Sequence, residues 1–520
     1  MLDYLIKNGT VAEGTGGPLR EADLGIQGDR IVFIGKGAPN AREVVDAGGL
    51  IVCPGFIDTH SHSDFTIIAD GRAEGRISQG VTTEINGNCG LSAAPLYGEA
   101  VERREEEFRE LGIRERWSSF REYFGILEEK GTAINVATLC GHGNIRGSVI
   151  GYENRTARTD EMAGMQELLA DAVMSGAMGL STGLIYPPGI YSDTRELIEL
   201  SRVLPQGSVY ASHMRSEGDS LSEALREAIS IGRESGVKVH ISHLKTSGRH
   251  NWHKIEEAIS LMDNARSSGI PLSCDRYPYT AAGTDLDIVL PSWTYEGGTE
   301  AELRRLQDPL TRERIEAEMG EKAEDYWKGI ALSSVTREEN KWMEGETMHG
   351  ISLRMGMRPM DALFRILIEE RLRVGAIFFS MSEENLLRFL SLPYLMIGSD
   401  SSGRSFSGPT RIGKPHPRAF GTFPRFIGRY VKEKAVMALP EAVRRITSLP
   451  AEIFGFRERG LIRQGYYADI TVFGYDGISD GATFQEPFVP SGGIRHVFVN
   501  GSPAMKNGAF AGSLTGRVLK

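Results

Sequence analysis

The chain is poor in cysteine and has no long apolar run. No segment approaches the ~20 apolar residues of a helical membrane span, and the first residues lack the apolar core and cleavage site of a signal peptide. The few cysteines are widely separated, which argues against a disulfide framework and for free thiols or thiolate ligands. We therefore expect a cytoplasmic protein without a membrane partner. The four cysteines are Cys53, Cys89, Cys140 and Cys274.

An excess of positive charge is also missing. The 520 residues include 59 Lys and Arg against 69 Asp and Glu, which gives a formal net charge of −10. This balance argues against a nucleic-acid partner or an anionic membrane surface. With 40% hydrophobic and 25% charged residues, the composition is that of an ordinary globular protein. A small molecule is the better candidate for a partner.

Short apolar runs alternate with longer helical segments through the middle of the chain. Strand–helix alternation predicts a parallel sheet, and so many units favour a closed (β/α)₈ barrel in the α/β class. Nine runs qualify as strands, so one of them must lie outside an eight-stranded barrel. The runs include residues 51–57, 81–85, 134–139, 177–181, 208–212, 237–241, 376–380 and 395–399, and the helical candidates include 160–175, 217–235 and 252–268.

The two ends and one internal segment differ from this pattern. Both ends contain short strand-like runs bounded by turn residues, so we expect them to pair into one small β-sandwich domain. The segment from about residue 286 is rich in charge, has few strand signals, and is predicted to form an inserted lobe. The predicted division is 1–55 and 456–520 for the two parts of the β-sandwich, 56–285 and 351–455 for the two parts of the catalytic barrel, and 286–350 for the lobe.

Side chains that bind metals follow several of the predicted strands. His60 and His62 follow the run at 51–57. Residues two apart in a strand share a face, so both side chains can point at one ion. The carboxyl ends of all barrel strands meet on one face, where nitrogen, sulfur and carboxylate donors suit zinc. The six candidate ligands are His60, His62, Cys89, His213, His243 and Asp400.

Each candidate ligand has a simpler interpretation when taken alone. A histidine at a strand end is often a satisfied polar group, Cys89 fits a small apolar core residue, and Asp400 fits a turn cap. Six coincidences at six strand ends are much rarer than one shared site, so we predict a metal centre. We expect the remaining cysteines, with His142 and His240, to be packing residues or to lie behind the ligands.

Several motifs are more specific than single residues. With them the chain resembles the N-acyl-D-amino-acid deacylases (D-aminoacylases) of the amidohydrolase superfamily over nearly its whole length. The motifs around Cys89 and His213 separate this family from hydantoinases and dihydroorotases, which usually rely on a carboxylated lysine bridge. The matching segments are 54–62, 80–83, 87–90, 210–218, 241–245, 277–281, 398–400, 416–418 and 421–425.

The resemblance implies two metal positions. One zinc ion is held tightly, while the other position is weaker or vacant. The implied ligands are Cys89, His213 and His243 for the first position and His60, His62 and Asp400 for the second.

The resemblance also implies residues that bind the substrate. Four of them grip its α-carboxylate, for which arginine offers a bidentate fork and lysine a point charge. Tyr186 resembles a tyrosine that polarises the scissile carbonyl. Lys245 or Arg418 alone also fits an ordinary ion pair, and Tyr186 fits a packing residue. The four carboxylate-binding candidates are Lys245, Tyr279, Thr284 and Arg418.

Two departures from the family pattern concern substrate preference. Thr284 stands where serine is expected, which keeps the hydroxyl and adds a methyl group. Residues 401–408 form a longer segment than in typical relatives, so Arg404 or Arg411 is an alternative to Arg418 for binding an anion.

The activity implied by the resemblance is zinc-dependent hydrolysis of N-acyl-D-amino acids to a carboxylate and a D-amino acid. Asp400 would accept a proton from the attacking water and return it to the leaving amine. The D configuration comes from the resemblance alone. Asp285 and Asp287 follow Thr284 closely, so we expect acidic substrate side chains to be disfavoured.

Two other readings remain open. The nearer is an amidohydrolase of the hydantoinase or dihydroorotase kind that opens cyclic amides, or one that cleaves D-dipeptides. The more remote is a non-catalytic scaffold, which is disfavoured because such proteins typically lose metal ligands and all six are present here.

Overall fold

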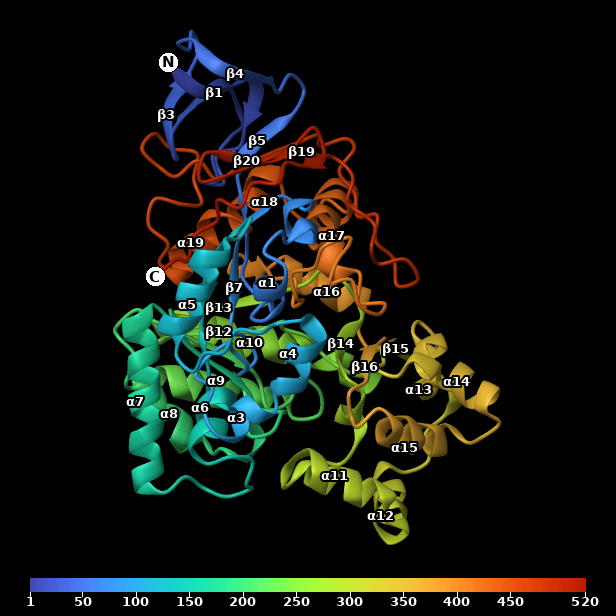
Figure 1. The fold of residues 1–520 in the computed structure, drawn as a ribbon. Helices are drawn as coiled ribbons and strands as arrows, with labels where there is room; N and C mark the ends of the chain where they lie inside the picture. The colour runs from blue at the N-terminus through green and yellow to red at the C-terminus, as the bar shows by residue number, and fades with distance from the viewer.

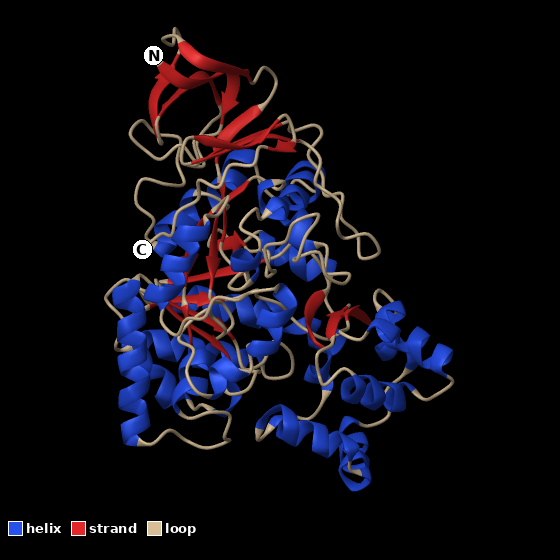
Figure 2. Ribbon diagram, viewed as in Figure 1, coloured by secondary structure: helices blue, strands red, loops and turns tan.

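The structure is a computed structural model that describes residues 1–520. Figure 1 shows three parts: a β-rich part at the top that contains both blue and red segments, a barrel region below it, and a helical lobe at the lower right. Figure 2 shows strands in the top part and the centre, with helices around the central strands. No helix combines the length and the apolar character needed to cross a bilayer.

Eight parallel strand positions form the barrel, in the order β6, β7, β8 with its continuation β9, β10, β11, β12, β13 and β17. The predicted α/β barrel fold is thus confirmed. The bounds are β6 (Phe56–Asp58), β7 (Val81–Asn86), β8 (Asn135–Thr138), β9 (Cys140–Gly141), β10 (Gly179–Gly183), β11 (Val209–His213), β12 (Lys238–Ile241), β13 (Leu272–Arg276) and β17 (Leu395–Ile397).

The barrel closes just beyond its first and last strands. Asp400 N donates to His60 O at 2.8 Å. His62 N donates to Ser401 O at 3.0 Å. The fully buried guanidinium of Arg76 also donates to Ser401 O, at 2.5 Å. These bonds place the segment that follows β6 against the segment that follows β17.

Helices cover the outside of the barrel, which explains why its strands are buried on both faces. In α9, Leu221, Leu225 and Ile229 form a buried stripe at helical spacing, and the helix ends at Gly236 with a left-handed φ of 79°. The helices outside the lobe are α1 (Thr66–Ala69), α2 (Glu74–Ile77), α3 (Glu99–Glu102), α4 (Glu105–Leu111), α5 (Phe120–Lys130), α6 (His142–Val149), α7 (Thr159–Ser175), α8 (Thr194–Ser201), α9 (Leu221–Ser235), α10 (Ile255–Ser267), α16 (Glu383–Leu390), α17 (Arg418–Arg425), α18 (Leu439–Arg445) and α19 (Ser448–Phe454).

The two chain ends share one nine-stranded sheet. The link between them is the antiparallel pairing of β5 with β18, in which Ile51 lies opposite Phe473. The strands are β1 (Leu2–Val11), β2 (Arg20–Gln27), β3 (Arg30–Gly35), β4 (Ala41–Asp46), β5 (Ile51–Pro54), β18 (Ile470–Phe473), β19 (Ile494–Val499), β20 (Ser502–Lys506) and β21 (Ala509–Phe510).

The lobe has its own apolar core and a small sheet in the order β14, β16, β15. The strand candidate at 376–380 forms β16 here and lies outside the barrel. The lobe therefore extends from β14 to β16, wider than the predicted 286–350, because a helix followed by an apolar strand has the same pattern as a barrel unit. Its elements are β14 (Ala282–Asp285), α11 (Gly298–Gln307), α12 (Pro309–Met319), α13 (Glu324–Lys328), β15 (Ile330–Ser334), α14 (Met348–Met355), α15 (Pro359–Glu369) and β16 (Gly375–Phe378).

Candidate active site

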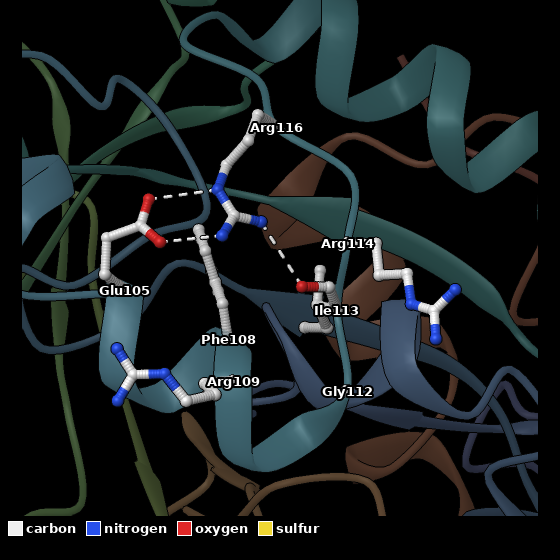
Figure 3. Close-up of a pocket in the computed structure, with 7 residues that line it drawn as sticks. All are labelled: Glu105, Phe108, Arg109, Gly112, Ile113, Arg114 and Arg116. Carbon is white, nitrogen blue, oxygen red and sulfur yellow. Dashed lines mark hydrogen bonds and ion pairs between the residues drawn. The ribbon is translucent and has the colours of Figure 1, made fainter.

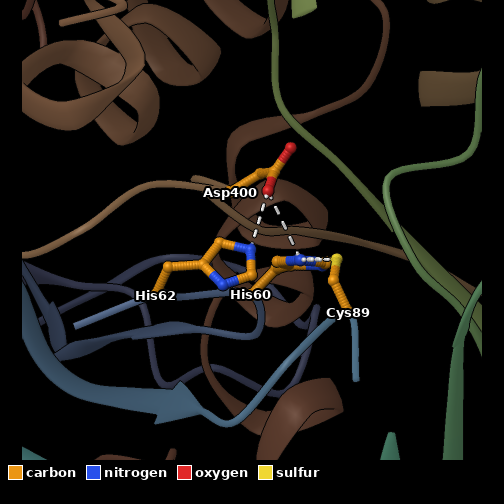
Figure 4. Close-up of side chains that lie close together, drawn as sticks. All are labelled: His60, His62, Cys89 and Asp400. Atoms are coloured by element: carbon orange, nitrogen blue, oxygen red, sulfur yellow. Dashed lines mark hydrogen bonds and ion pairs between the residues drawn. The ribbon is translucent and has the colours of Figure 1, made fainter. Parts of the chain in front are cut away.

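The predicted ligands converge at the carboxyl end of the barrel. Cys89 Sγ lies 3.3 Å from both His60 Nε2 and His243 Nε2. Asp400 Oδ1 lies 3.1 Å from His62 Nε2 and 3.4 Å from His60 Nε2. Figure 4 shows how the aspartate reaches both imidazoles while the thiol meets His60 from the other side.

The candidate ligands form two groups that share Cys89. The ligand atoms of each group lie within 4.8 Å of one another, and all but His62 belong to buried residues. Because Cys89 belongs to both groups, its sulfur lies between two potential metal positions. The groups are His60, His62, Cys89 and Asp400, and Cys89, His213 and His243.

Three of these residues have a left-handed backbone. The φ angles are 54° for Cys89, 35° for His243 and 50° for Asp400. A non-glycine residue pays on the order of 1–3 kcal/mol in such a conformation. The strain is concentrated where the chain leaves β7, β12 and β17, and therefore where the side chains converge.

Cys89 differs from the other cysteines in its electrostatic surroundings. Burial alone would raise the pKa of its thiol, but the imidazoles of His60 and His243 outweigh burial and hold this pKa well below its usual value. Burial raises the pKa of the other three thiols, which have no such neighbours. Only Cys89 is thus prepared to act as a thiolate ligand. All four cysteines are buried and unpaired.

Asp275 lies behind the ligands and was not predicted from sequence. Its Oδ2 is 3.1 Å from His60 Nδ1 and 2.7 Å from His240 Nε2, while its Oδ1 accepts the backbone N–H of His243 at 2.8 Å. A carboxylate on the far nitrogen of a histidine fixes the ring and raises its basicity. The available signal was the position of Asp275 near the end of a strand-like run.

Glu217 plays the same part for His243. Its Oε1 is 2.8 Å from His243 Nδ1 and 2.5 Å from Lys245 Nζ. Burial would raise the pKa of Glu217, but Lys245 and His243 outweigh it and keep this pKa well below its usual value. Glu217 lies in the motif at 210–218, but no role was predicted for it, although its position four residues after His213 was a usable signal.

The donor chemistry fits a zinc ion. Both ring nitrogens of His213 are buried without a hydrogen-bond partner, which is costly for a polar atom unless something binds it. A thiolate and two imidazoles are typical zinc ligands, and three protein ligands leave a coordination position open for chemistry. The second group adds a carboxylate and two more imidazoles beside the same sulfur.

Other predicted residues surround the ligand cluster. Arg418 Nη1 lies 2.9 Å from Asp400 Oδ2, and Arg418 Nη2 donates to Gly283 O at 3.2 Å. Tyr186 packs its ring edge-on to His213, with centroids 5.1 Å apart. Its hydroxyl lies 2.9 Å from that of Thr284. The lobe strand β14 thus supplies one wall of the site.

Tyr279 reaches the same region through His416. The two rings meet edge-on at 5.0 Å, and His416 Nδ1 accepts the backbone N–H of Arg418 at 3.0 Å. The Tyr279 hydroxyl is buried and has no hydrogen-bond partner. A Cβ at Gly421 would lie 2.7 Å from this hydroxyl, so the hydroxyl packs against α17.

The two alternative arginines make other contacts. Arg404 donates to the carbonyls of Thr410 and Ile412 and so closes its own loop. Arg411 is exposed and stacks over the ring of Phe488 at 5.0 Å. Of the three arginines, Arg418 is the one paired with Asp400.

A surface hollow of about 530 Å³ lies elsewhere, along α4. Figure 3 shows Arg116 bound to Glu105 and to the carbonyl of Ile113, with Arg109 and Arg114 at the sides. None of its lining residues is a predicted ligand or substrate-binding residue, so the hollow is separate from the site.

A model of the amidohydrolase family matches residues 43–238 and 398–505, which is more than half of the chain. The chain belongs to the amidohydrolase family. The unmatched segment between the two ranges contains β13 and β17 as well as the lobe, which is inserted between these last two barrel strands.

Curated relatives confirm the resemblance to D-aminoacylases. A D-aminoacylase from Alcaligenes xylosoxydans xylosoxydans is 36% identical, covering 99% of this chain and 97% of that protein. An N-acyl-D-glutamate deacylase from the same organism is also 36% identical, covering 96% and 93%. An N-acyl-D-aspartate deacylase from it is 33% identical, covering 99% and 95%.

Solved structures agree. The N-acyl-D-glutamate deacylase of Bordetella bronchiseptica, complexed with zinc and a phosphonate mimic of the tetrahedral intermediate, has a TM-score of 0.84 and 34% identity, covering 100% of this chain and 99% of that one. A D-aminoacylase crystal structure also has a TM-score of 0.84, at 35% identity and full coverage of both chains. A dihydropyrimidinase from Brevibacillus agri NCHU1002, at 17% identity and a TM-score of 0.56, shares the fold.

We predict that Glu217→Gln weakens the affinity for added zinc by about 10- to 100-fold, because loss of the carboxylate frees the His243 ring. Competition with a chromophoric chelator measures this affinity. Glu234→Gln, at an exposed glutamate 4.0 Å from Arg202, is the control and should bind zinc as the unaltered protein does. Equal affinity in the Glu217 variant would contradict the positioning described here.

Proposed function

We propose that this protein is a zinc-dependent hydrolase of N-acyl-D-amino acids that releases a carboxylate and a free D-amino acid. The observation that carries the proposal is the convergence of six donors at one barrel end, with Arg418 2.9 Å from Asp400. A metal-ligand cluster beside a carboxylate-binding fork suits a substrate that has an amide and a carboxylate close together. The relatives named D-aminoacylase and N-acyl-D-glutamate deacylase support the same substrate class.

Zinc is the proposed cofactor, with Cys89, His213 and His243 as the tight site. When bound there, it supplies a Lewis acid that polarises a carbonyl and lowers the pKa of water. His60, His62 and Asp400 are proposed to form the second, weaker position.

Proton transfer is assigned to Asp400. Its carboxylate takes a proton from the attacking water and delivers it to the nitrogen of the leaving amine. Arg418, His243 and His60 outweigh burial and hold the pKa of Asp400 well below its usual value, so it starts the cycle as the base. The Tyr186 hydroxyl is proposed to donate to the oxyanion that develops on the scissile carbonyl.

Binding of the substrate α-carboxylate is assigned to Arg418, Lys245, Tyr279 and Thr284. Arg418 supplies the fork and Lys245 a second charge, while the Tyr279 and Thr284 hydroxyls supply neutral donors. Fixing the carboxylate on one side of the metal lets one hand of the substrate present its carbonyl. The partner is therefore an N-acylated amino acid, and the cysteine pattern supports a cytoplasmic location.

Free amine release from N-acetyl-D- and N-acetyl-L-amino acids, with metal content measured on the same sample, tests the proposal. We expect bound zinc and turnover of the D series alone. Zinc without turnover of either series would favour cyclic amides or D-dipeptides. Absence of zinc and turnover after metal addition would favour a scaffold.

Two substitutions should separate metal binding from proton transfer. Cys89→Ala should lose tight zinc and activity together while keeping the fold. Asp400→Asn should keep zinc but lower kcat by about 10²- to 10⁴-fold, the usual contribution of general acid–base catalysis. Metal analysis, circular dichroism and steady-state kinetics measure these effects. Full activity of Cys89→Ala would refute the assigned zinc site.

Acidic residues lie close in sequence to the proposed binding site for the substrate α-carboxylate. Asp285 and Asp287 follow Thr284, and neither carboxylate takes part in a side-chain ion pair. The nearby Arg104 is already bonded to Glu107 at 3.0 Å. Negative charge beside the site opposes an acidic substrate side chain, so we propose a preference for neutral side chains.

This preference should depend on pH. Burial, and then the Asp285 charge, raises the pKa of Asp287 to about 7. The carboxyl is neutral below that pH and charged above it, so discrimination against N-acetyl-D-glutamate should increase as pH rises through about 7. We expect the kcat/KM ratio of N-acetyl-D-leucine to N-acetyl-D-glutamate to rise by about three- to tenfold between about pH 6 and 8.

Asp287→Asn should flatten this pH profile, while Glu313→Gln, at an exposed lobe residue, should leave it unchanged. Preferential turnover of N-acetyl-D-glutamate or N-acetyl-D-aspartate would disprove the preference.

A further inference from the structure

The loop that carries Tyr186 is held by one arginine. Arg215 Nη1 donates to Ile190 O at 3.1 Å, and Arg215 Nη2 donates to Ser192 O at 3.0 Å. Both carbonyls lie between β10 and α8, a few residues beyond Tyr186. Arg215 itself stands two residues after His213. The segment that presents a candidate ligand therefore also grips the loop that presents Tyr186.

The orientation of Arg215 is fixed by Glu227 on α9. Arg215 Nε and Nη2 donate to the two carboxylate oxygens of Glu227, both at 3.0 Å. Glu227 also accepts the hydroxyl of Thr194, at the start of α8, at 2.9 Å. The planar guanidinium thus makes four directed hydrogen bonds, a pattern that a lysine ammonium cannot reproduce.

The grip on the loop reaches Tyr186 through the backbone. Ile190 N donates to Tyr186 O at 2.9 Å, so a shift of Ile190 moves the turn that contains both residues. The Tyr186 ring in turn contacts His213, and its hydroxyl meets Thr284. A displacement of the loop would therefore move this hydroxyl relative to the metal ligands.

We infer that Arg215 is a positioning residue that holds the Tyr186 hydroxyl in place over the ligand cluster. The inference rests on the role proposed for Tyr186 in amide hydrolysis. It makes Arg215 part of the same functional unit as Tyr186, although Arg215 contacts neither the ligand atoms nor the expected position of the substrate. When two residues act as one unit, substituting both lowers the activity about as much as substituting one, so the two losses do not multiply.

A double-mutant cycle tests the inference. Tyr186→Phe should lower kcat by about 10- to 100-fold, as loss of an oxyanion donor does. Arg215→Lys should lower kcat by about tenfold with little change in KM, because displacement of the Tyr186 hydroxyl weakens its hydrogen bond to the oxyanion. The kcat of the double variant should equal that of Tyr186→Phe alone within about twofold, because Arg215 affects kcat only through the Tyr186 hydroxyl, which is already absent. Losses that multiply, or a kcat unchanged in Arg215→Lys, would overturn the inference.

Zinc content, the thermal midpoint and hydrogen exchange separate positioning from a general structural defect. Arg215→Lys should keep zinc and show faster amide exchange in residues 184–192 than the unaltered protein. Loss of zinc, or amide exchange in residues 184–192 at the rate of the unaltered protein, would contradict the positioning role of Arg215. Glu227→Gln is a second variant that should show the same coupling to Tyr186→Phe. Arg226→Lys is the control, because Arg226 forms an exposed ion pair with Glu257. This substitution should change neither the zinc content, nor the thermal midpoint, nor the exchange rate of the loop.

The exchange measurement also separates this inference from the proposed function. If no N-acyl-D-amino acid is hydrolysed, the proposed function fails. Faster exchange in residues 184–192 of Arg215→Lys would still show that Arg215 holds this loop, and unchanged exchange would refute it. If hydrolysis occurs but the cycle shows independent losses, the function stands and the role of Arg215 fails.

Discussion

Closure of the barrel between residues 60–62 and 400–401 is the constraint on which the site depends. Two backbone hydrogen bonds cross this seam, and the buried guanidinium of Arg76 bonds the Ser401 carbonyl beside them. Arg76 also lies 3.1 Å from Glu84, so its charge is balanced inside the protein. With the seam closed, His60 and His62 face Asp400. With the seam open, the six donors could not share one place.

Buried ionisable groups at the site stabilise one another in pairs. The Cys89 thiolate is favoured by imidazoles, and Glu217 by Lys245 and His243. Removing one member of a buried pair leaves the other charged without a partner, which costs several kcal/mol. The ligand set is therefore preorganised by carboxylates behind it as well as by the strands that carry it.

The inserted lobe contacts the candidate site through one of its strands. Strand β14 brings Thr284 to Tyr186 and the Gly283 carbonyl to Arg418. The family match covers the barrel strands from β6 to β11 and resumes at residue 398, directly after β17. Five of the six proposed metal ligands lie within the matched ranges and His243 lies just beyond the first of them, whereas the acidic residues proposed to select the substrate side chain lie in the insertion.

Sequence alone was enough to predict the barrel, because apolar runs and helical segments are local patterns. The residues it named as candidate metal ligands lie close together in the structure, and their role as ligands remains a prediction. Sequence did not reveal Asp275 and Glu217 as supports, and it placed the lobe boundary at residue 350 because α15 and β16 resemble a barrel unit. Arg215 lies in the motif at 210–218, but nothing in the sequence indicated what it contacts. Which carboxylate reaches which imidazole, and which carbonyl Arg215 holds, depends on side chains from distant strands meeting in space. Only the closed tertiary structure decides those contacts, because hydrogen bonds form between atoms that are neighbours in space and not in sequence.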